Sequence, residues 1–278
     1  MTAARIEQCF AACRAQGRPA LIIYLTVGDP SVDDSLACAL AALAAGADIL
    51  ELGVPFSDPS ADGPVIAAAS QRAIRSGGSL RKALEVAGRI REESAAPLVL
   101  FSYVNPLIAF GEEQLPKALA AVGVDAVLVV DLPPEEGAEL RAGLARESIA
   151  VIPLIAPTTD PEREAHVLGG AQGFVYYVSV AGVTGAGVGA EADISAGVER
   201  AKRISKLPVA VGFGVRTPEQ AAAFARISDG VVVGSALVEE VRAAVEQGDP
   251  ASSVKRISVV AKSLSNAIVM ARSDRSVH

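Results

Sequence analysis

The sequence is poor in aromatic residues and in histidine. Its 278 residues include no tryptophan, and phenylalanine and tyrosine bring the aromatic content to only 4%. The two histidines are His166, in a polar stretch with a helical pattern, and His278, the last residue. We expect His166 on the surface, and so few histidines argue against a Ser-His-Asp triad or a histidine-based metal site. The few aromatic side chains become informative about where a flat ligand could lie.

Features of three other protein classes are also missing. Cys9, Cys13 and Cys38 are odd in number and fit no zinc spacing, so we interpret them as unpaired thiols in a reducing cytosol. A net charge of -7 without a Lys- or Arg-rich run argues against nucleic acid or anionic membrane as the main partner. No apolar run reaches transmembrane length and the amino terminus lacks a signal-peptide core, so we expect a cytoplasmic protein.

Short apolar, β-branched runs recur about 20 to 35 residues apart, each followed by an Ala-rich segment of helical period. Most runs are apolar nearly throughout, as expected of parallel strands covered on both faces. Eight such units, with further helices at 3–16 and 252–271, predict an α/β protein: a (β/α)8 TIM barrel with an extra N-terminal helix. No linker divides the sequence, so we expect one domain over 1–278; an open doubly wound sheet is the alternative. The predicted strands are 20–27, 47–53, 97–103, 124–131, 149–155, 173–179, 208–214 and 230–234.

Two carboxylates stand out in the stretch ELGVPFSDPSADGP (51–64). Glu51 lies at the end of a predicted strand, and Asp62 follows in a loop stiffened by prolines. Two carboxylates in different environments are the usual equipment for moving two protons in one reaction. The structural alternative is that Asp58 and Asp62 cap turns and that Glu51 is a solvated strand end. We favour Glu51 and Asp62 as catalytic residues because other segments build a site around them.

Glycine-rich turns follow the last three predicted strands. Glycine lets the backbone approach a ligand, and a helix amino terminus adds free N–H donors for an anion. Barrels often bind phosphate at this end, so we expect a phosphate site here, with Ser235 donating its hydroxyl or acting as a helix N-cap. The first turn could also close over substrate as a lid. The turns are 182–189, which contains Thr184 and Gly185, 212–214, and 234–235.

Five aromatic residues fall on predicted strands or at their ends. Any one of them would more often be a core residue, but as a group they suit a planar, apolar ring. We therefore expect a flat slot between the carboxylates and the phosphate site. These residues are Tyr24, Phe101, Tyr103, Tyr176 and Phe213.

Five motifs of this sequence resemble those of the tryptophan synthase alpha chain family. They are ELGVPFSDPSADGP (51–64), YLTVGDP (24–30), GVTGAG (182–187), VGFGV (211–215) and VGSALV (233–238). The resemblance spans nearly the whole sequence. It implies a retro-aldol cleavage of indole-3-glycerol phosphate to indole and glyceraldehyde 3-phosphate, without metal or organic cofactor, in tryptophan biosynthesis.

The resemblance also implies roles for individual residues. Glu51 would protonate the ring carbon that bears the side chain and take the proton of the neighbouring hydroxyl. Asp62 would hold the indole N–H, and Tyr103 would support Glu51. The implied phosphate contacts are Gly185, Gly214, Gly234 and Ser235, and the implied indole contacts are Tyr24, Phe101, Tyr176 and Phe213.

The family works with a beta chain that carries pyridoxal phosphate, in an alpha2beta2 complex through which indole passes. The resemblance implies that 55–58 and 131–134 would meet this partner. Three residues depart from the family pattern: Tyr24 replaces a usual phenylalanine, Ser60 a usual leucine, and Gly187 an arginine common after GVTGA. A stand-alone lyase, a non-catalytic activating partner of a beta chain and a different phosphate-binding barrel enzyme are the alternatives.

Overall fold

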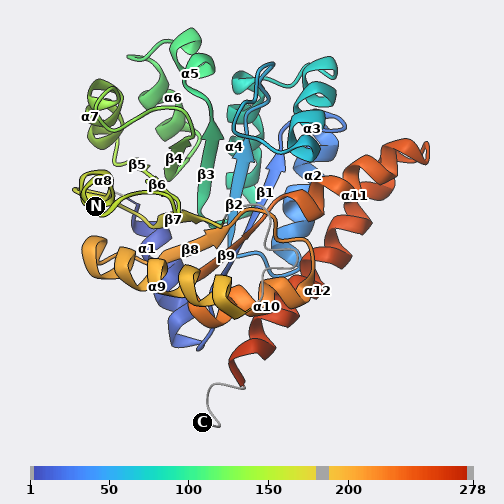
Figure 1. Cartoon of the computed structure of the whole chain (residues 1–278). Coiled ribbons are helices and arrows are strands. Elements are labelled where there is room, and N and C mark those ends of the chain that lie inside the picture. The colour runs from blue at the N-terminus through green and yellow to red at the C-terminus, as the bar shows by residue number, and fades with distance from the viewer. Residues whose placement is uncertain (1–2, 180–187, 274–278) are drawn as a thin grey trace.

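The computed structural model describes residues 3–179 and 188–273. Nine parallel strands form one sheet in the order β5-β4-β3-β2-β1-β9-β8-β7-β6, and the chain itself joins β5 to β6 (Figure 1). The sheet thus curls into the barrel that the eight repeated units predict. The strands are β1 (Ala20–Thr26), β2 (Ile49–Gly53), β3 (Leu98–Ser102), β4 (Ala126–Val129), β5 (Ala150–Val151), β6 (Leu154–Ile155), β7 (Val175–Val178), β8 (Val209–Gly212) and β9 (Gly230–Val233).

One predicted strand, 149–155, is divided into β5 and β6. Pro153 lies at the break and has no N–H to donate. The backbone at the break still makes hydrogen bonds to both neighbouring strands. The Ile152 N–H donates to Val127 O of β4 (2.9 Å), and the Tyr176 N–H of β7 donates to Pro153 O (2.9 Å). The nine strands therefore occupy eight positions around the barrel.

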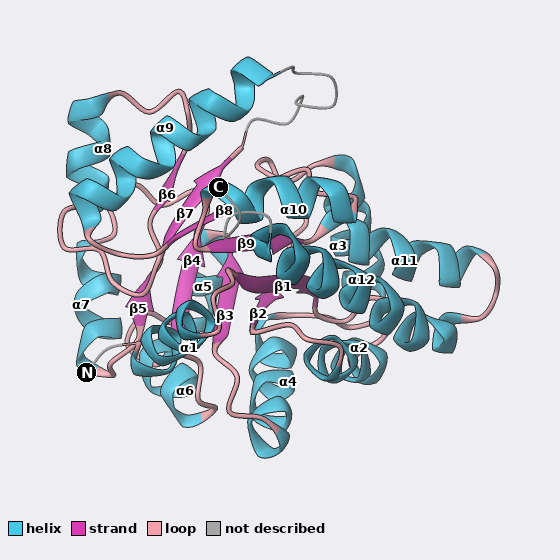
Figure 2. Cartoon of the chain, turned by 90° about the horizontal axis from the view of Figure 1, so that it is seen from below, coloured by secondary structure: helices cyan, strands magenta, loops and turns pink. Residues whose placement is uncertain are grey.

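Helices cover the outside of the sheet (Figures 1 and 2). Several begin at polar caps: the side chains of Ser31, Ser79, Asp160 and Thr217 each accept a backbone N–H of the first turn. No helix within the described residues is both long and apolar enough to cross a membrane. The helices are α1 (Ala4–Ala15), α2 (Val32–Ala44), α3 (Pro64–Arg75), α4 (Leu80–Glu93), α5 (Val104–Phe110), α6 (Leu115–Ala121), α7 (Ala138–Arg146), α8 (Pro161–Leu168), α9 (Val188–Ser205), α10 (Pro218–Ile227), α11 (Ser235–Glu246), η1 (Pro250–Ser252) and α12 (Ser253–Ser273).

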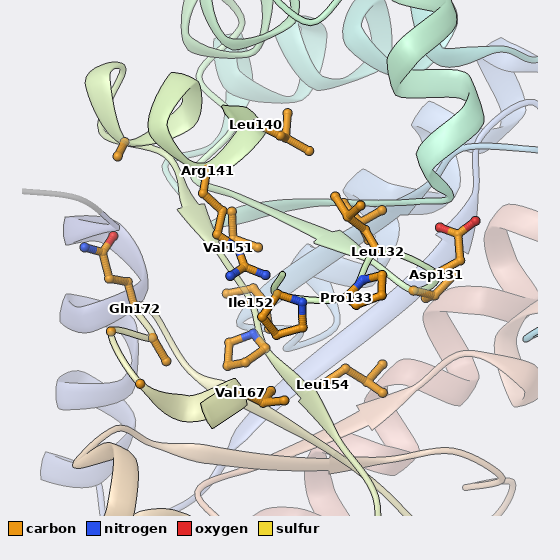
Figure 3. Close-up of a pocket in the computed structure, with 18 of the residues that line it drawn as sticks. Asp131, Leu132, Pro133, Leu140, Arg141, Val151, Ile152, Leu154, Val167 and Gln172 are labelled. Carbon is orange, nitrogen blue, oxygen red and sulfur yellow. The ribbon is translucent and has the colours of Figure 1, made fainter. Parts of the chain in front are cut away.

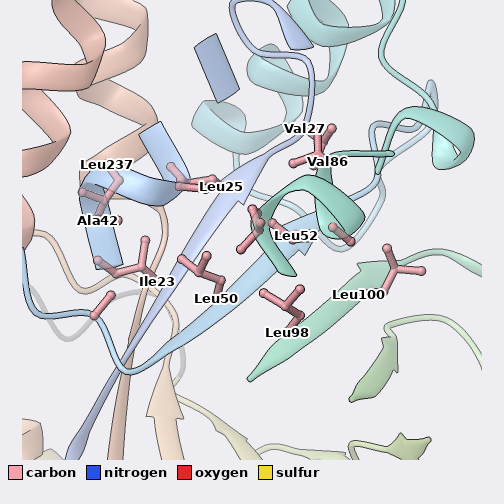
Figure 4. Packing of buried hydrophobic residues seen from close by; sticks show 14 of the residues in the cluster. Ile23, Leu25, Val27, Ala42, Leu50, Leu52, Val86, Leu98, Leu100 and Leu237 are labelled. Atoms are coloured by element: carbon pink, nitrogen blue, oxygen red, sulfur yellow. The ribbon is translucent and has the colours of Figure 1, made fainter. Parts of the chain in front are cut away.

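Side chains alternate between the two faces of each strand, and both faces are buried. In β1, Leu21 and Ile23 pack outward with the surrounding helices, whereas Ile22 and Tyr24 belong to the cluster inside the barrel. Every residue of β1 is buried. Figure 4 shows the outer layer, in which aliphatic side chains of β1, β2 and β3 pack against α2, α4 and α11.

The same alternation aims Glu51 into the barrel. Its neighbours Leu50 and Leu52 belong to the outer cluster, so Glu51 must face inward. In the parallel register Tyr24 is opposite Glu51, and Phe101 is opposite Gly53. Three adjacent strands therefore bring an acid and two aromatic rings to the inside of the barrel, near the carboxyl ends of the strands.

The extra N-terminal helix, α1, closes the amino end of the barrel. Ile6, Phe10 and Cys13 of α1 are buried against the inner cluster, and the Phe10 ring lies 5.7 Å from that of Phe174. With this end sealed, a ligand enters from the carboxyl ends of the strands, where active sites of this fold lie.

Candidate active site

A cavity of about 160 Å³ lies at the carboxyl ends of the strands. It brings together nine of the predicted site residues, whereas Tyr103 does not line it. Thr184 and Gly185 lie outside the described residues. The lining residues are Tyr24, Glu51, Asp62, Gly63, Pro64, Ile66, Phe101, Tyr176, Phe213, Gly214, Arg216, Val232, Gly234 and Ser235.

Glu51 is the most buried ionisable group of the cavity. Its exposed fraction is 1%, and neither carboxyl oxygen has a hydrogen-bond partner among the described residues. Burial without compensation penalises the charged form and raises the pKa of Glu51 to about 8. Glu51 is therefore protonated at neutral pH, and the alternative of a solvated strand end is wrong.

Asp62 is half-buried in the loop between β2 and α3. Burial raises the pKa of its carboxyl to about 6, and a hydrogen bond with Tyr103 limits the rise. The Tyr103 hydroxyl also accepts the N–H of Ala61 (3.0 Å). Tyr103 therefore holds the loop that carries Asp62, because its ring reaches that loop from the end of β3, and it makes no hydrogen bond to Glu51.

The two carboxyls thus differ in charge at neutral pH. Glu51 carries a proton that it can give, whereas Asp62 is largely ionised and can accept a hydrogen bond or stabilise a cation. Different environments that separate two pKa values are the arrangement that general acid–base catalysis requires.

Aromatic rings form the walls of the cavity, and glycines make room for them. A Cβ atom at Gly53 would lie 2.2 Å from the Tyr24 hydroxyl oxygen, and one at Gly212 would lie 2.4 Å from the Tyr176 hydroxyl oxygen. Tyr24 meets Phe101 edge-on, with the ring centroids 5.2 Å apart. The rings are therefore held against bare backbone, which sets the width of a flat slot.

The far end of the cavity offers backbone donors to an anion. Gly234 is the N-cap of α11 and no side chain caps this helix, so Ser235 is not the N-cap and the first N–H groups face the cavity end. Phe213 has φ 89°, a strained conformation for a bulky residue. The buried Ser179 stabilises this turn, because its hydroxyl donates to Phe213 O (2.8 Å) and Gly212 O (2.9 Å).

Arg216 was not predicted from the sequence. Among the described residues it is the one Lys or Arg that lines the cavity, and it takes no part in their ion pairs. Its position directly after the VGFGV turn could have indicated it as a candidate. The motif does not show, however, that the Arg216 side chain points toward the cavity. Pro64 and Ile66 of α3 were missed for the same reason.

A larger cavity, of about 470 Å³, lies outside the barrel between α7 and α8 (Figure 3). Its walls come from the 131–134 turn, the broken strand and α8, and Arg141 reaches into it. Burial lowers the pKa of Arg141. Among the described residues that line it, Asp131 is the one carboxylate, so the pair of acids that the chemistry needs lies in the smaller cavity.

Comparison with known proteins points to one family. A family model described as tryptophan synthase alpha chain matches residues 10–269. The chain is 45% identical to the tryptophan synthase alpha chain of Caulobacter sp. (strain K31) and 44% identical to that of Caulobacter vibrioides (strain NA1000 / CB15N), in each case over 98% of both chains.

Solved structures agree with this result. The tryptophan synthase alpha subunit of Legionella pneumophila str. Paris superposes with a TM-score of 0.87 at 32% identity, covering 96% of this chain and 98% of that one. A chain of Mycobacterium tuberculosis tryptophan synthase gives a TM-score of 0.85 at 37% identity, covering 95% and 98%.

Glu51→Gln should change how stability depends on pH. The unfolded pKa is near 4.5 and the folded one about 8, so the native state binds the extra proton between them. Stability from neutral Glu51 is complete below pH 4.5 and is lost as the pH rises through 8. We expect the free energy of unfolding of the parent to fall relative to Glu51→Gln over this range, by a few kcal/mol. Urea titrations across the range measure the difference, and a constant difference would contradict the buried neutral acid.

Proposed function

The chain belongs to the tryptophan synthase alpha chain family, and from this premise we propose how its residues perform the reaction. It is a lyase that cleaves indole-3-glycerol phosphate to indole and glyceraldehyde 3-phosphate, the alpha-subunit role in tryptophan biosynthesis. The observation that carries the assignment of the site is the pair of carboxyls with separated pKa values in one aromatic cavity.

Glu51 begins the reaction as an acid. The indole ring lies between the aromatic walls, and Glu51 gives its proton to the ring carbon that bears the glycerol phosphate. The ring becomes a cation whose charge is centred on nitrogen. Asp62, ionised at neutral pH, accepts the indole N–H hydrogen bond and stabilises this charge.

Glu51, now a carboxylate, then acts as a base. It removes the proton of the hydroxyl group next to the ring, and the carbon–carbon bond breaks. The electron pair of that bond restores the aromatic ring, and the oxygen becomes the aldehyde of glyceraldehyde 3-phosphate. Glu51 recovers its proton, so we propose that this chain needs no metal or organic cofactor of its own.

The phosphate binds at the glycine end of the cavity. Gly214, Gly234 and Ser235 present backbone N–H groups and a hydroxyl there. The family motif predicts Gly185 as a further phosphate contact and Thr184 as a substrate contact. We add Arg216 to the phosphate contacts. Backbone donors carry only partial charge, whereas the Arg216 guanidinium, which makes no ion pair within the part of the chain that the structure describes, matches a phosphate dianion in charge and geometry.

We also propose an alpha2beta2 complex in the cytoplasm, with pyridoxal phosphate in the beta chain. Segment 55–58 and turn 131–134 form the proposed contact. The Phe56 ring lies 5.2 Å from that of Tyr103, whose hydroxyl binds the loop of Asp62. A partner bound against segment 55–58 would therefore shift the loop that carries Asp62. This favours a lyase whose activity depends on a beta chain over a stand-alone lyase or a non-catalytic activator.

Indole release from indole-3-glycerol phosphate, by the purified chain alone and with a beta chain added, tests this assignment. We expect slow turnover that rises strongly with the beta chain, because the partner orders the Asp62 loop. Fast turnover alone would identify a stand-alone lyase, and none in either case would contradict the enzymatic role. In the same assay Glu51→Gln should lose at least about 10³-fold in kcat, and Asp62→Asn roughly 10²- to 10³-fold.

Asp58→Asn is the matched control for Asp62→Asn in the isolated chain, since Asp58 is an exposed acid of the same loop. It should retain parental turnover. Turnover of either catalytic variant within a few-fold of the parent would reject the role given to that residue.

Arg216→Gln should weaken substrate binding through the phosphate. A lost charge-assisted contact is worth about 1.5–3 kcal/mol, so KM should rise roughly 10- to 100-fold with little change in kcat. Competition by inorganic phosphate should weaken in parallel, and Arg216→Lys should recover part of the loss. Arg226→Gln, at the exposed far end of α10, is the control. An unchanged inhibition constant for phosphate in Arg216→Gln would remove Arg216 from the site.

A further inference from the structure

Two of the three cysteines meet an aspartate at the amino end of the barrel, away from the catalytic cavity. Cys9 and Cys13 are one turn apart on α1, and Asp48 directly precedes β2. The two sulfur atoms and a carboxylate oxygen of Asp48 all lie within 4.8 Å of one another. The Cys9 Sγ also lies 3.6 Å from the backbone oxygen of Asp48. The spacing of the cysteines in the sequence does not predict this cluster, because its third residue, Asp48, lies far from them in the sequence.

The donor set suits a soft divalent cation. Zinc binds thiolate sulfur at about 2.3 Å in tetrahedral geometry, which places two sulfur ligands about 3.8 Å apart. The two sulfur atoms therefore need to approach each other by at most about 1 Å to share an ion. Cys13 is buried and Cys9 is partly exposed, so an ion could enter from the surface on the Cys9 side.

Arg18 completes the electrostatics of this cluster. Its guanidinium makes two hydrogen bonds to Asp48, at 2.6 and 2.8 Å, and the Leu21 N–H donates to Oδ2 of the same carboxylate (2.8 Å). Oδ1 keeps a lone pair, and Arg18 holds the carboxylate in one orientation, as outer-shell partners of metal ligands do. Two thiolates, one carboxylate and one guanidinium sum to a charge of about −2, which a divalent cation neutralises.

An ion pair between Arg18 and Asp48 alone would account for the aspartate, but not for two sulfur atoms brought against it.

We propose that Cys9, Cys13 and Asp48 bind one zinc ion, with water or the Asp48 carbonyl as the fourth ligand. Binding breaks two S–H bonds, and both protons pass to solvent. Because α1 supplies two ligands and the start of β2 the third, the ion ties the N-terminal helix to the barrel. The site takes no part in the cleavage reaction.

Cobalt(II) provides a direct probe, because thiolate ligands give it a charge-transfer absorption and tetrahedral geometry gives intense visible bands. The reduced full-length chain is titrated with Co²⁺ and then with Zn²⁺. We expect a band that saturates at one ion per chain, is abolished by Zn²⁺, and is accompanied by a zinc-dependent rise in Tm.

Cys9→Ser and Cys13→Ser should lose both the band and the rise in Tm, while Cys38→Ser, which alters the third free cysteine, keeps them. Cys9 is partly exposed, so Cys9→Ser remains informative if the buried Cys13→Ser does not fold. Absence of the band in the parent, or its survival in Cys9→Ser, would overturn the proposal. Indole release should be the same in all three variants, which separates this site from the catalytic one.

Discussion

The removal of Glu51 from water is the constraint on which the catalytic site depends. A carboxyl buried without a hydrogen-bond partner keeps its proton at neutral pH, which makes it an acid without help from a metal or a cation. The cost of this burial is met by the barrel as a whole, whose inner and outer layers are filled with aliphatic side chains. Asp62, less buried and bonded to Tyr103, stays ionised in the same cavity and complements it.

Close contacts between rings and glycines maintain that environment. Tyr24 and Tyr176 lie directly over Gly53 and Gly212, where any Cβ atom would collide with a hydroxyl oxygen. The same contacts exclude water from Glu51 and define a slot for a planar ring. The unusual backbone of Phe213, bonded to Ser179, then turns the chain toward the anion end. Acid, slot and anion end are thus consequences of one packing arrangement.

Much of this architecture is predictable from the sequence, because apolar runs and strand alternation are local properties. The barrel, the N-terminal helix and the convergence of Glu51 with the aromatic residues follow from them, whereas the division of the predicted strand 149–155 at Pro153 was not predicted. Contacts that depend on how loops fold back are not predictable in this way. The Tyr103 bond to Ala61, the direction of Arg216 and the meeting of two cysteines with Asp48 all join segments distant in the chain.

Infrared spectroscopy of Glu51 tests the central claim most directly. A protonated carboxyl has a carbonyl stretch that a carboxylate lacks, and the difference between the parent and Glu51→Gln isolates the band of this residue. The account predicts that the band is present at pH 7 and titrates away with a midpoint near 8. Its absence at pH 7, or a midpoint near the ordinary value of 4.5, would show that Glu51 is charged and cannot begin the reaction as an acid.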